Sequence, residues 1–218
     1  MNHNTFLMRN YPKTKRNIED RLSNITDTDR EKARKFDKDF FDGERRYGYG
    51  GYKYDGRWIP VVKDFIDYFK LNENSSILDI GAGKGFMVKD FKDALPGAKV
   101  FGIDISKYSI DNSMPEIKQF MSVGNANNLE FEDNSFDLVI SINTVHNLPL
   151  NECKHSLNEI SRVSKKDSFI IVDSWNNEEE EIRMKSWNLT ALTYMSAIDW
   201  IKLFNEVGYD GDFDWFIP

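Results

Sequence analysis

The chain has 218 residues, of which 40% are hydrophobic, and a formal net charge of -7. This length and composition fit one domain with a single core, and the acidic balance argues against a protein that binds mainly nucleic-acid phosphates. The acidic charge leads us to expect no nucleic-acid partner. One cysteine excludes an internal disulfide, and three scattered histidines give no metal-ligand spacing, so we also expect no metal site.

The N-terminus is polar, and the longest apolar runs along the chain have the length of strands. A membrane helix needs about 20 apolar residues, and a secretory signal needs an apolar core. We therefore expect a cytoplasmic protein that does not contact a membrane.

We predict that residues 1–60 form an N-terminal arm with an aromatic loop, which is not an independent domain. Within it, residues 45–58 combine five aromatic residues with four glycines. Such a segment does not form a helix, and disordered segments are usually poor in aromatic residues, so we expect this loop to pack against the rest of the chain. Residues 61–69 then predict an amphipathic helix that opens a domain spanning residues 61–218.

From about residue 75 apolar runs alternate with helical patterns. The predicted strands are 77–80, 100–105, 120–123, 136–142 and 169–172, and the predicted helices include 86–94, 151–163 and 196–207. Strands this apolar are typical of a parallel sheet that is covered on both faces. We predict an α/β fold with a Rossmann-like, doubly wound, mainly parallel sheet and helices on both faces. After residue 207 there is room for one more strand.

A glycine loop follows the first predicted strand, with the sequence Asp79-Ile80-Gly81-Ala82-Gly83-Lys84-Gly85. Glycines at such a turn allow a ligand to approach the backbone closely. A dinucleotide fingerprint requires its third glycine one residue later, where this chain has Phe86, which disfavours a nicotinamide-dependent oxidoreductase.

Two further positions follow the next strands. Asp104 and Ile105 end the second strand, where a Rossmann-like sheet brings a carboxylate to ribose hydroxyls. Asn125 and Ala126 follow the third strand. Together with the glycine loop, this order resembles the small-molecule branch of the class I S-adenosylmethionine-dependent methyltransferases, over roughly residues 75 to 175.

The resemblance implies S-adenosylmethionine as the cofactor and a set of residues that bind it. These are Asp79, Gly81, Ala82, Gly83, Gly85, Asp104, Ile105, Asn125 and Ala126. In the family an acid usually occupies position 125, where it accepts a hydrogen bond from the adenine amino group. An asparagine amide oxygen can accept the same bond.

The end of the fourth strand is where the family places residues that face the methyl group and the acceptor. Ser141 is expected on the cofactor side, and Asn143 and His146 are the catalytic candidates. His146 has a reference pKa suited to a general base near neutral pH; alternatively, it packs and orders the loop. The segment lacks the Pro-Pro-aromatic motif of enzymes that methylate nucleobase amino groups.

The aromatic loop offers two more cofactor candidates. Tyr49 and Arg57 are expected to fold over the methionine end of the cofactor, where a guanidinium matches a carboxylate. The alternative is an apolar cluster that only stabilises the arm.

These patterns predict a methyltransferase that acts on an oxygen or nitrogen of a small-molecule acceptor. In-line displacement needs mainly alignment of the two reactants, so a base is optional. The alternative in a different class is a catalytically silent S-adenosylmethionine-binding protein with a regulatory or scaffolding role. A monomer or a homodimer is compatible with the sequence.

Overall fold

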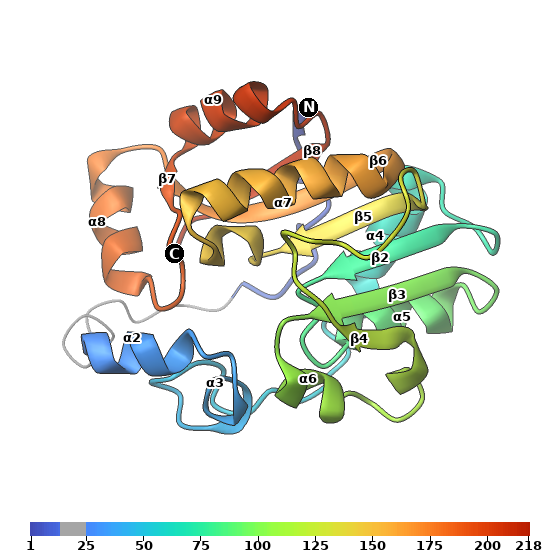
Figure 1. The fold of residues 1–218 in the computed structure, drawn as a ribbon, viewed down its shortest axis with the longest axis horizontal. Coiled ribbons are helices and arrows are strands. Elements are labelled where there is room, and N and C mark those ends of the chain that lie inside the picture. The colour runs from blue at the N-terminus through green and yellow to red at the C-terminus, as the bar shows by residue number, and fades with distance from the viewer. Residues whose placement is uncertain (14–24) are drawn as a thin grey trace.

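The computed structural model describes residues 1–13 and 25–218. Its main sheet has the strand order β1 (Asn2–His3), β8 (Asp212–Phe216), β6 (Ser164–Trp175), β5 (Phe136–Ile142), β2 (Ser76–Ile80), β3 (Lys99–Asp104) and β4 (Met121–Val123), with the short β7 (Met195–Ser196) beside β6. Every pairing between these strands is parallel. The predicted doubly wound parallel sheet is thereby confirmed (Figure 1).

Helices cover both faces of the sheet because alternate strand residues are apolar on both sides. Leu138 and Ile140 of β5 belong to the cluster under α4 (Ile59–Phe69) and α5 (Phe86–Ala94). Val139, between them, belongs to the opposite cluster. That second cluster is covered by α7 (Leu150–Val163) and α9 (Ala197–Val207). Burial of apolar surface in both layers is the main source of stability, at about 25 cal/mol per Å² removed from water.

The sheet ends at an edge formed by β8 and β1, and the pairing of β1 there was not predicted from the sequence. The expected single strand after α9 is present, and it pairs parallel with β6 rather than in an antiparallel hairpin. The first residues of the chain then add β1 outside it. Asn2 and Asn4 each donate a side-chain hydrogen bond of 2.9 Å to the Asp212 carboxylate, which fixes the N-terminus to this edge.

The arm and a C-terminal insertion lie beyond the carboxyl ends of the strands. The arm contributes α2 (Asp27–Ala33) and α3 (Lys38–Asp42), and the insertion contributes α8 (Glu178–Trp187). Figure 1 shows all three at the same side of the sheet. Arg30 of α2 donates a hydrogen bond of 3.3 Å to the carbonyl oxygen of Asn188, so the arm contacts the segment that follows α8.

Short helices complete the connections: α6 (Lys107–Asp111) after β3, a turn of 3₁₀ helix (Lys118–Phe120) before β4, and a second such turn (Val145–Asn147) after β5. Within the two described stretches of the chain, none of the helices is both long and apolar enough to cross a membrane.

Candidate functional site

The site lies at the point where the connections leave the sheet in opposite directions. β2 is followed by β3 on one side and is paired with β5 on the other, and ligands of doubly wound sheets bind outside the carboxyl ends at such a switch point. Two cavities open there, of about 310 Å³ and about 1090 Å³. The residues that line both are Tyr49, Tyr52, Gly81, Ile142 and Asn143.

The glycine loop forms one wall of the site through its backbone. Gly81, Gly83 and Gly85 have φ angles of 78°, 58° and 79°, a region that favours glycine. A Cβ on Gly81 would lie 2.0 Å from the hydroxyl oxygen of Thr144, so a side chain does not fit there. The amides of Gly81 and Ala82 donate to the carbonyl of β3 residue 103 at 2.8 and 2.9 Å, which fixes the loop against the sheet.

Asp104 lies in the smaller cavity, as its position at the end of β3 predicts. Its carboxylate accepts hydrogen bonds of 2.8 Å from the backbone amides of Gly83 and Ser106. Burial raises its pKa, while these two bonds oppose the rise. A carboxylate offers about four acceptor positions, so this group retains capacity for a ligand hydroxyl. Predicted residues that also line this cavity are Ile105, Asn125 and Ala126.

Asp79 is a buried carboxyl group at the end of β2 that lines the larger cavity. Burial raises its pKa to about 7, and the negative charge of Asp104 adds to the rise. Across the described parts of the chain no side chain or amide donates a hydrogen bond to it. The carboxyl group is therefore available to a cationic ligand group, which would stabilise its ionised form.

Three expected site residues, Gly85, His146 and Ser141, are buried and line neither cavity. His146 is 3% exposed and lines neither cavity. Its Nδ1 accepts the backbone amide of Asp173 at 3.0 Å, and Nε2 lies 3.6 Å from the carboxylate of the same residue. Burial lowers the pKa of His146, against the opposing charge of Asp173. Ser141 is also fully buried, on the β5 face covered by α7, and lines neither cavity.

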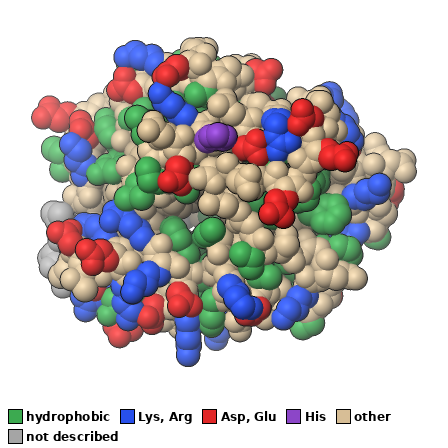
Figure 2. Space-filling view, in the orientation of Figure 1, with side chains coloured by type: hydrophobic (Ala, Val, Ile, Leu, Met, Phe, Trp, Pro, Cys, Tyr) green, Lys and Arg blue, Asp and Glu red, His purple; other side chains and the backbone are tan. Residues whose placement is uncertain are grey.

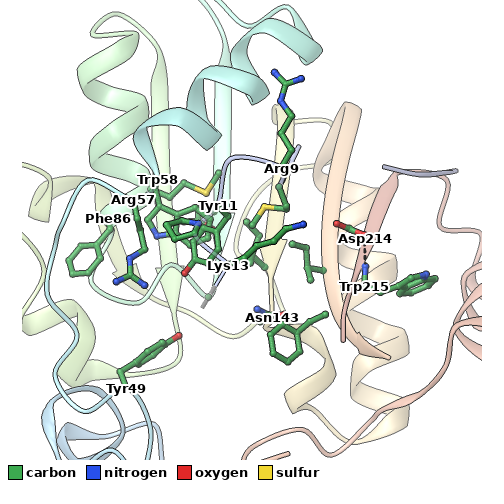
Figure 3. Close-up of a pocket in the computed structure, with 18 of the residues that line it drawn as sticks. Arg9, Tyr11, Lys13, Tyr49, Arg57, Trp58, Phe86, Asn143, Asp214 and Trp215 are labelled. Atoms are coloured by element: carbon green, nitrogen blue, oxygen red, sulfur yellow. Dashed lines mark hydrogen bonds between the residues drawn. The ribbon is translucent and has the colours of Figure 1, made fainter. Parts of the chain in front are cut away.

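The aromatic loop packs against the start of α5, directly after the glycine loop. The Tyr52 ring stacks on Phe86, with centroids 4.5 Å apart, and Tyr49 lies 4.2 Å from Tyr52. In Figure 3 the hydroxyl of Tyr49 points into the cavity that Asn143 and Arg57 also border. The guanidinium of Arg57 already pairs with Asp55, through Nη2 at 2.6 Å and Nε at 2.9 Å.

An ion pair joins the arm to the glycine loop and was not predicted from the sequence. The Lys84 ammonium lies 2.6 Å from the Asp42 carboxylate and 3.1 Å from the carbonyl oxygen of Tyr52. The Tyr108 hydroxyl donates to the same carboxylate at 2.8 Å. Lys84 lies between two glycines of the loop, at a position that the glycine pattern leaves unspecified, and Asp42 lies 42 residues away, so no local pattern could have paired them.

Asn147 is a second residue that sequence reasoning missed. It lines the smaller cavity beside Asn125. Its amide nitrogen donates to the carbonyl oxygen of Asn143 at 3.1 Å. Its amide oxygen is buried, and no described residue donates to it. A buried acceptor without a partner is costly, so this oxygen is ready to accept from a ligand amino group.

Comparison with known proteins indicates the type of domain. Residues 78–172 match a family profile described as a methyltransferase domain. The chain is 27% identical over 180 residues to 2-methyl-6-phytyl-1,4-hydroquinone methyltransferase of Synechocystis sp., across 71% of this chain and 54% of that protein. It is 30% identical over 142 residues to tRNA (carboxymethyluridine(34)-5-O)-methyltransferase of Arabidopsis thaliana, across 65% of this chain and 32% of that protein. The chain thus spans about half, or less, of the length of these curated relatives.

A solved structure shares the fold. The YcgJ protein of Bacillus subtilis superposes with a TM-score of 0.55 at 19% identity, across 67% of this chain and 66% of that one. The profile match covers β2 to β6, which carry the glycine loop and the ends of the strands at the switch point. The matching methyltransferase domain, together with the parallel sheet and the glycine loop, supports a class I S-adenosylmethionine-dependent methyltransferase.

Proposed function

We propose that the protein transfers a methyl group from S-adenosylmethionine to an oxygen or nitrogen of a small-molecule acceptor in the larger cavity. The observation that carries this proposal is the junction of the two cavities at the carboxyl ends of β2 and β5. Gly81, Asn143 and Tyr49 line both cavities. A cofactor whose nucleoside occupies the smaller cavity has its reactive end at this junction, next to the space for an acceptor.

The residues of the smaller cavity fit the nucleoside half of the cofactor. The Asp104 carboxylate retains acceptor capacity for the ribose hydroxyls. Two amide oxygens, of Asn125 and Asn147, can accept from an adenine amino group, and that of Asn147 has no donor among the described residues. The glycines leave the backbone free of side chains where the nucleoside approaches.

The methionine half needs groups for an ammonium and a carboxylate. Asp79 supplies a negative charge for the ammonium, and the attraction lowers its raised pKa. Arg57 remains our candidate for the carboxylate: a guanidinium has five N–H donors, and Asp55 engages only Nε and Nη2. The Tyr49 hydroxyl, which points into the same cavity, is the second candidate donor.

S-adenosylmethionine supplies an electrophilic methyl group: an acceptor lone pair forms the new bond to its carbon, and the carbon–sulfur electron pair stays on sulfur. The chain has to align the acceptor and exclude water, which can lower a barrier by about 7 to 11 kcal/mol. Tyrosine hydroxyls have a pKa of about 10, so those of Tyr49 and Tyr52 are protonated near neutral pH and serve as hydrogen-bond donors. The acceptor proton is then lost to water.

In our proposal His146 has a structural role, because its ring is buried and lines neither cavity. A base must lie within hydrogen-bond reach of the proton that it removes. Because Nδ1 accepts a backbone amide, the proton of the neutral ring is on Nε2, which faces the Asp173 carboxylate. The carbonyl oxygen of His146 also accepts the amides of Leu192 and Thr193 at 3.0 and 2.9 Å. We therefore assign His146 to ordering the loop after β5.

The choice of a small acceptor rests on the shape of the larger cavity and on the acidic chain. Its volume of about 1090 Å³ holds the methionine end together with a ligand of metabolite size, since small-molecule sites typically measure about 300 to 1000 Å³. One relative is named for a hydroquinone and another for a tRNA uridine. The net charge of -7 favours the small molecule over the nucleic acid.

Calorimetric titration with S-adenosylmethionine and S-adenosylhomocysteine, with NADH as a control, tests the cofactor site. We expect both sulfur ligands to bind and Asp104→Ala to weaken both. No binding by the parent protein, or a preference for NADH, overturns the proposal. Formation of S-adenosylhomocysteine with a panel of acceptors then tests transfer. Binding without transfer to any acceptor would favour the silent binding protein.

A further inference from the structure

The larger cavity has a charge balance opposite to that of the whole chain. The chain carries 29 basic and 36 acidic residues. The residues around the larger cavity include five basic side chains, Arg9, Lys13, Arg45, Lys53 and Arg57, and two acidic ones, Asp79 and Asp214. On the face shown in Figure 2, red and blue side chains are interspersed without a field of one sign. The lining of this cavity is therefore more basic than the chain as a whole.

Two of these cations lack a close partner among the described residues, although burial raises the pKa of the Asp214 carboxyl group and the charge of Lys13 opposes this rise. Arg9 pairs with Asp64 at 2.7 Å, and Arg57 pairs with Asp55. By contrast, neither Lys13 nor Lys53 forms an ion pair or a hydrogen bond with any described residue. In Figure 3 the side chain of Lys13 extends across the cavity above Asn143. Unpaired ammonium groups that border a cavity attract anions there.

The remainder of the lining is apolar and aromatic. Trp58, Phe86, Met8 and Ile171 are among these residues, and Tyr11 packs on Trp58 with centroids 4.6 Å apart. Aromatic walls favour a flat, apolar ligand body. A bound cofactor adds a sulfonium charge at the junction, which increases the positive potential that the acceptor meets.

We propose, on the basis of the methyltransferase function proposed above, that the acceptor is an aromatic or similarly flat molecule that carries an acidic group, and that Lys13 and Lys53 bind this group. The acid binds in the larger cavity, since these two lysines line that cavity and not the smaller one. The reacting oxygen or nitrogen then lies near Asn143. Its lone pair bonds to the methyl carbon, and its proton passes to water.

Matched ligand pairs test the charge requirement. The complex with S-adenosylhomocysteine is titrated with hydroxybenzoates and aminobenzoates and with the corresponding benzamides, which have nearly the same shape without the charge. We expect at least one acid to bind tenfold or more tightly than its amide, with an affinity that falls as salt is added. Methyl transfer to the better ligand of each pair is measured in parallel.

Charge-removing variants identify the groups responsible. Lys53→Met and Lys13→Met should each lower the affinity for the acid by threefold or more, and leave the affinities for the amide and for S-adenosylhomocysteine unchanged. Lys99→Met is the matched control, because Lys99 is exposed at the amino end of β3, on the opposite edge of the sheet.

The outcomes separate the two proposals. If no acid in the panel binds more tightly than its amide, the acidic acceptor is wrong, whereas methyl transfer to a neutral compound keeps the proposed function. If Lys53→Met and Lys13→Met behave like Lys99→Met, the assignment of the lysines is wrong. Tight, salt-dependent binding of tRNA, in place of the small acids, would assign the basic lining to a polyanion and also overturn the inference. Failure of the parent protein to bind S-adenosylhomocysteine would remove the proposed function itself.

Discussion

Asp79 makes ligand-free stability depend on pH in a direction that can be calculated. Its pKa rises from 3.8 to about 7 on folding, because burial and the charge of Asp104 disfavour the ionised form. The unfolded chain therefore releases this proton first as pH increases. The contribution of Asp79 to stability is complete below about pH 4 and is lost as pH rises through about 7.

The size of the effect follows from the shift. A change of about three pKa units corresponds to about 4 kcal/mol, at about 1.36 kcal/mol per unit. Between about pH 5 and about pH 7.5 the loss is about 2.5 kcal/mol. An asparagine at this position has no ionisation cost, so Asp79→Asn should be more stable than the parent, and its advantage should grow by about this amount over the same interval.

Urea unfolding followed by tryptophan fluorescence, at several pH values and without ligand, measures the difference. Groups such as His146 titrate in both proteins, so they cancel when the two curves are subtracted. Asp137→Asn is the control of opposite sign: the amide and hydroxyl of Ser76 each donate to Asp137 at 2.8 Å, its pKa is lowered, and its removal should destabilise the protein. A constant difference between Asp79→Asn and the parent across pH would refute the reasoning.

Three further predictions concern the neighbourhood of the cofactor. A Cβ at Gly83 would lie 3.0 Å from a tyrosine ring, whereas a Cβ at Gly208, which has a similar positive φ, would meet no atom within 4 Å. Gly83→Ala should therefore weaken S-adenosylhomocysteine binding about tenfold by calorimetry, and Gly208→Ala should leave it unchanged. Both variants should lose about 1 to 2 kcal/mol of stability, because alanine is strained at a positive φ. His146→Gln should lower the melting temperature and keep methyl transfer within about tenfold of the parent, since we assign it no proton transfer; complete loss of transfer in a folded variant that binds cofactor would restore the general base. Asp42→Asn and Lys84→Met should each speed ligand dissociation in stopped-flow experiments, with a coupling of about 0.5 to 3 kcal/mol in the double variant; additive effects would mean that the pair does not act as a unit.

The elements that sequence reasoning placed well are those defined by local signals. The helix predicted at 86–94 and the strand predicted at 136–142 coincide with α5 and β5. The helix ends before Pro96, and the strand is an apolar run whose side chains enter both cores. Asp104 could be assigned to the cavity because parallel strands bring their carboxyl ends to one edge of the sheet.

The features that sequence reasoning did not reach depend on contacts between distant segments. The direction of the His146 ring is set by Asp173 on β6, 27 residues away. The pairing of β1 with β8 joins residues 210 positions apart, through bonds such as that from Asn2 to Asp212. A strand of two residues has no periodicity to detect, and a histidine after a strand has the same sequence signature whether its ring faces a ligand or the core.

Two residues that line the larger cavity, Asn143 and Asp79, are each held in an energetically unfavourable state. Asn143 has a φ of 54°, a left-handed conformation that costs about 1 to 2 kcal/mol for a residue with a side chain, and Asp79 adds the ionisation cost derived above. Strain of this kind is retained where the surrounding structure enforces it, often at functional sites. A ligand ammonium stabilises the Asp79 carboxylate, so S-adenosylhomocysteine binding at about pH 6.5 should release a fraction of a proton from this residue. Calorimetry in buffers of different ionisation enthalpy measures that release; it should disappear in Asp79→Asn, and a parent protein that releases no proton would show that the ammonium does not bind at Asp79.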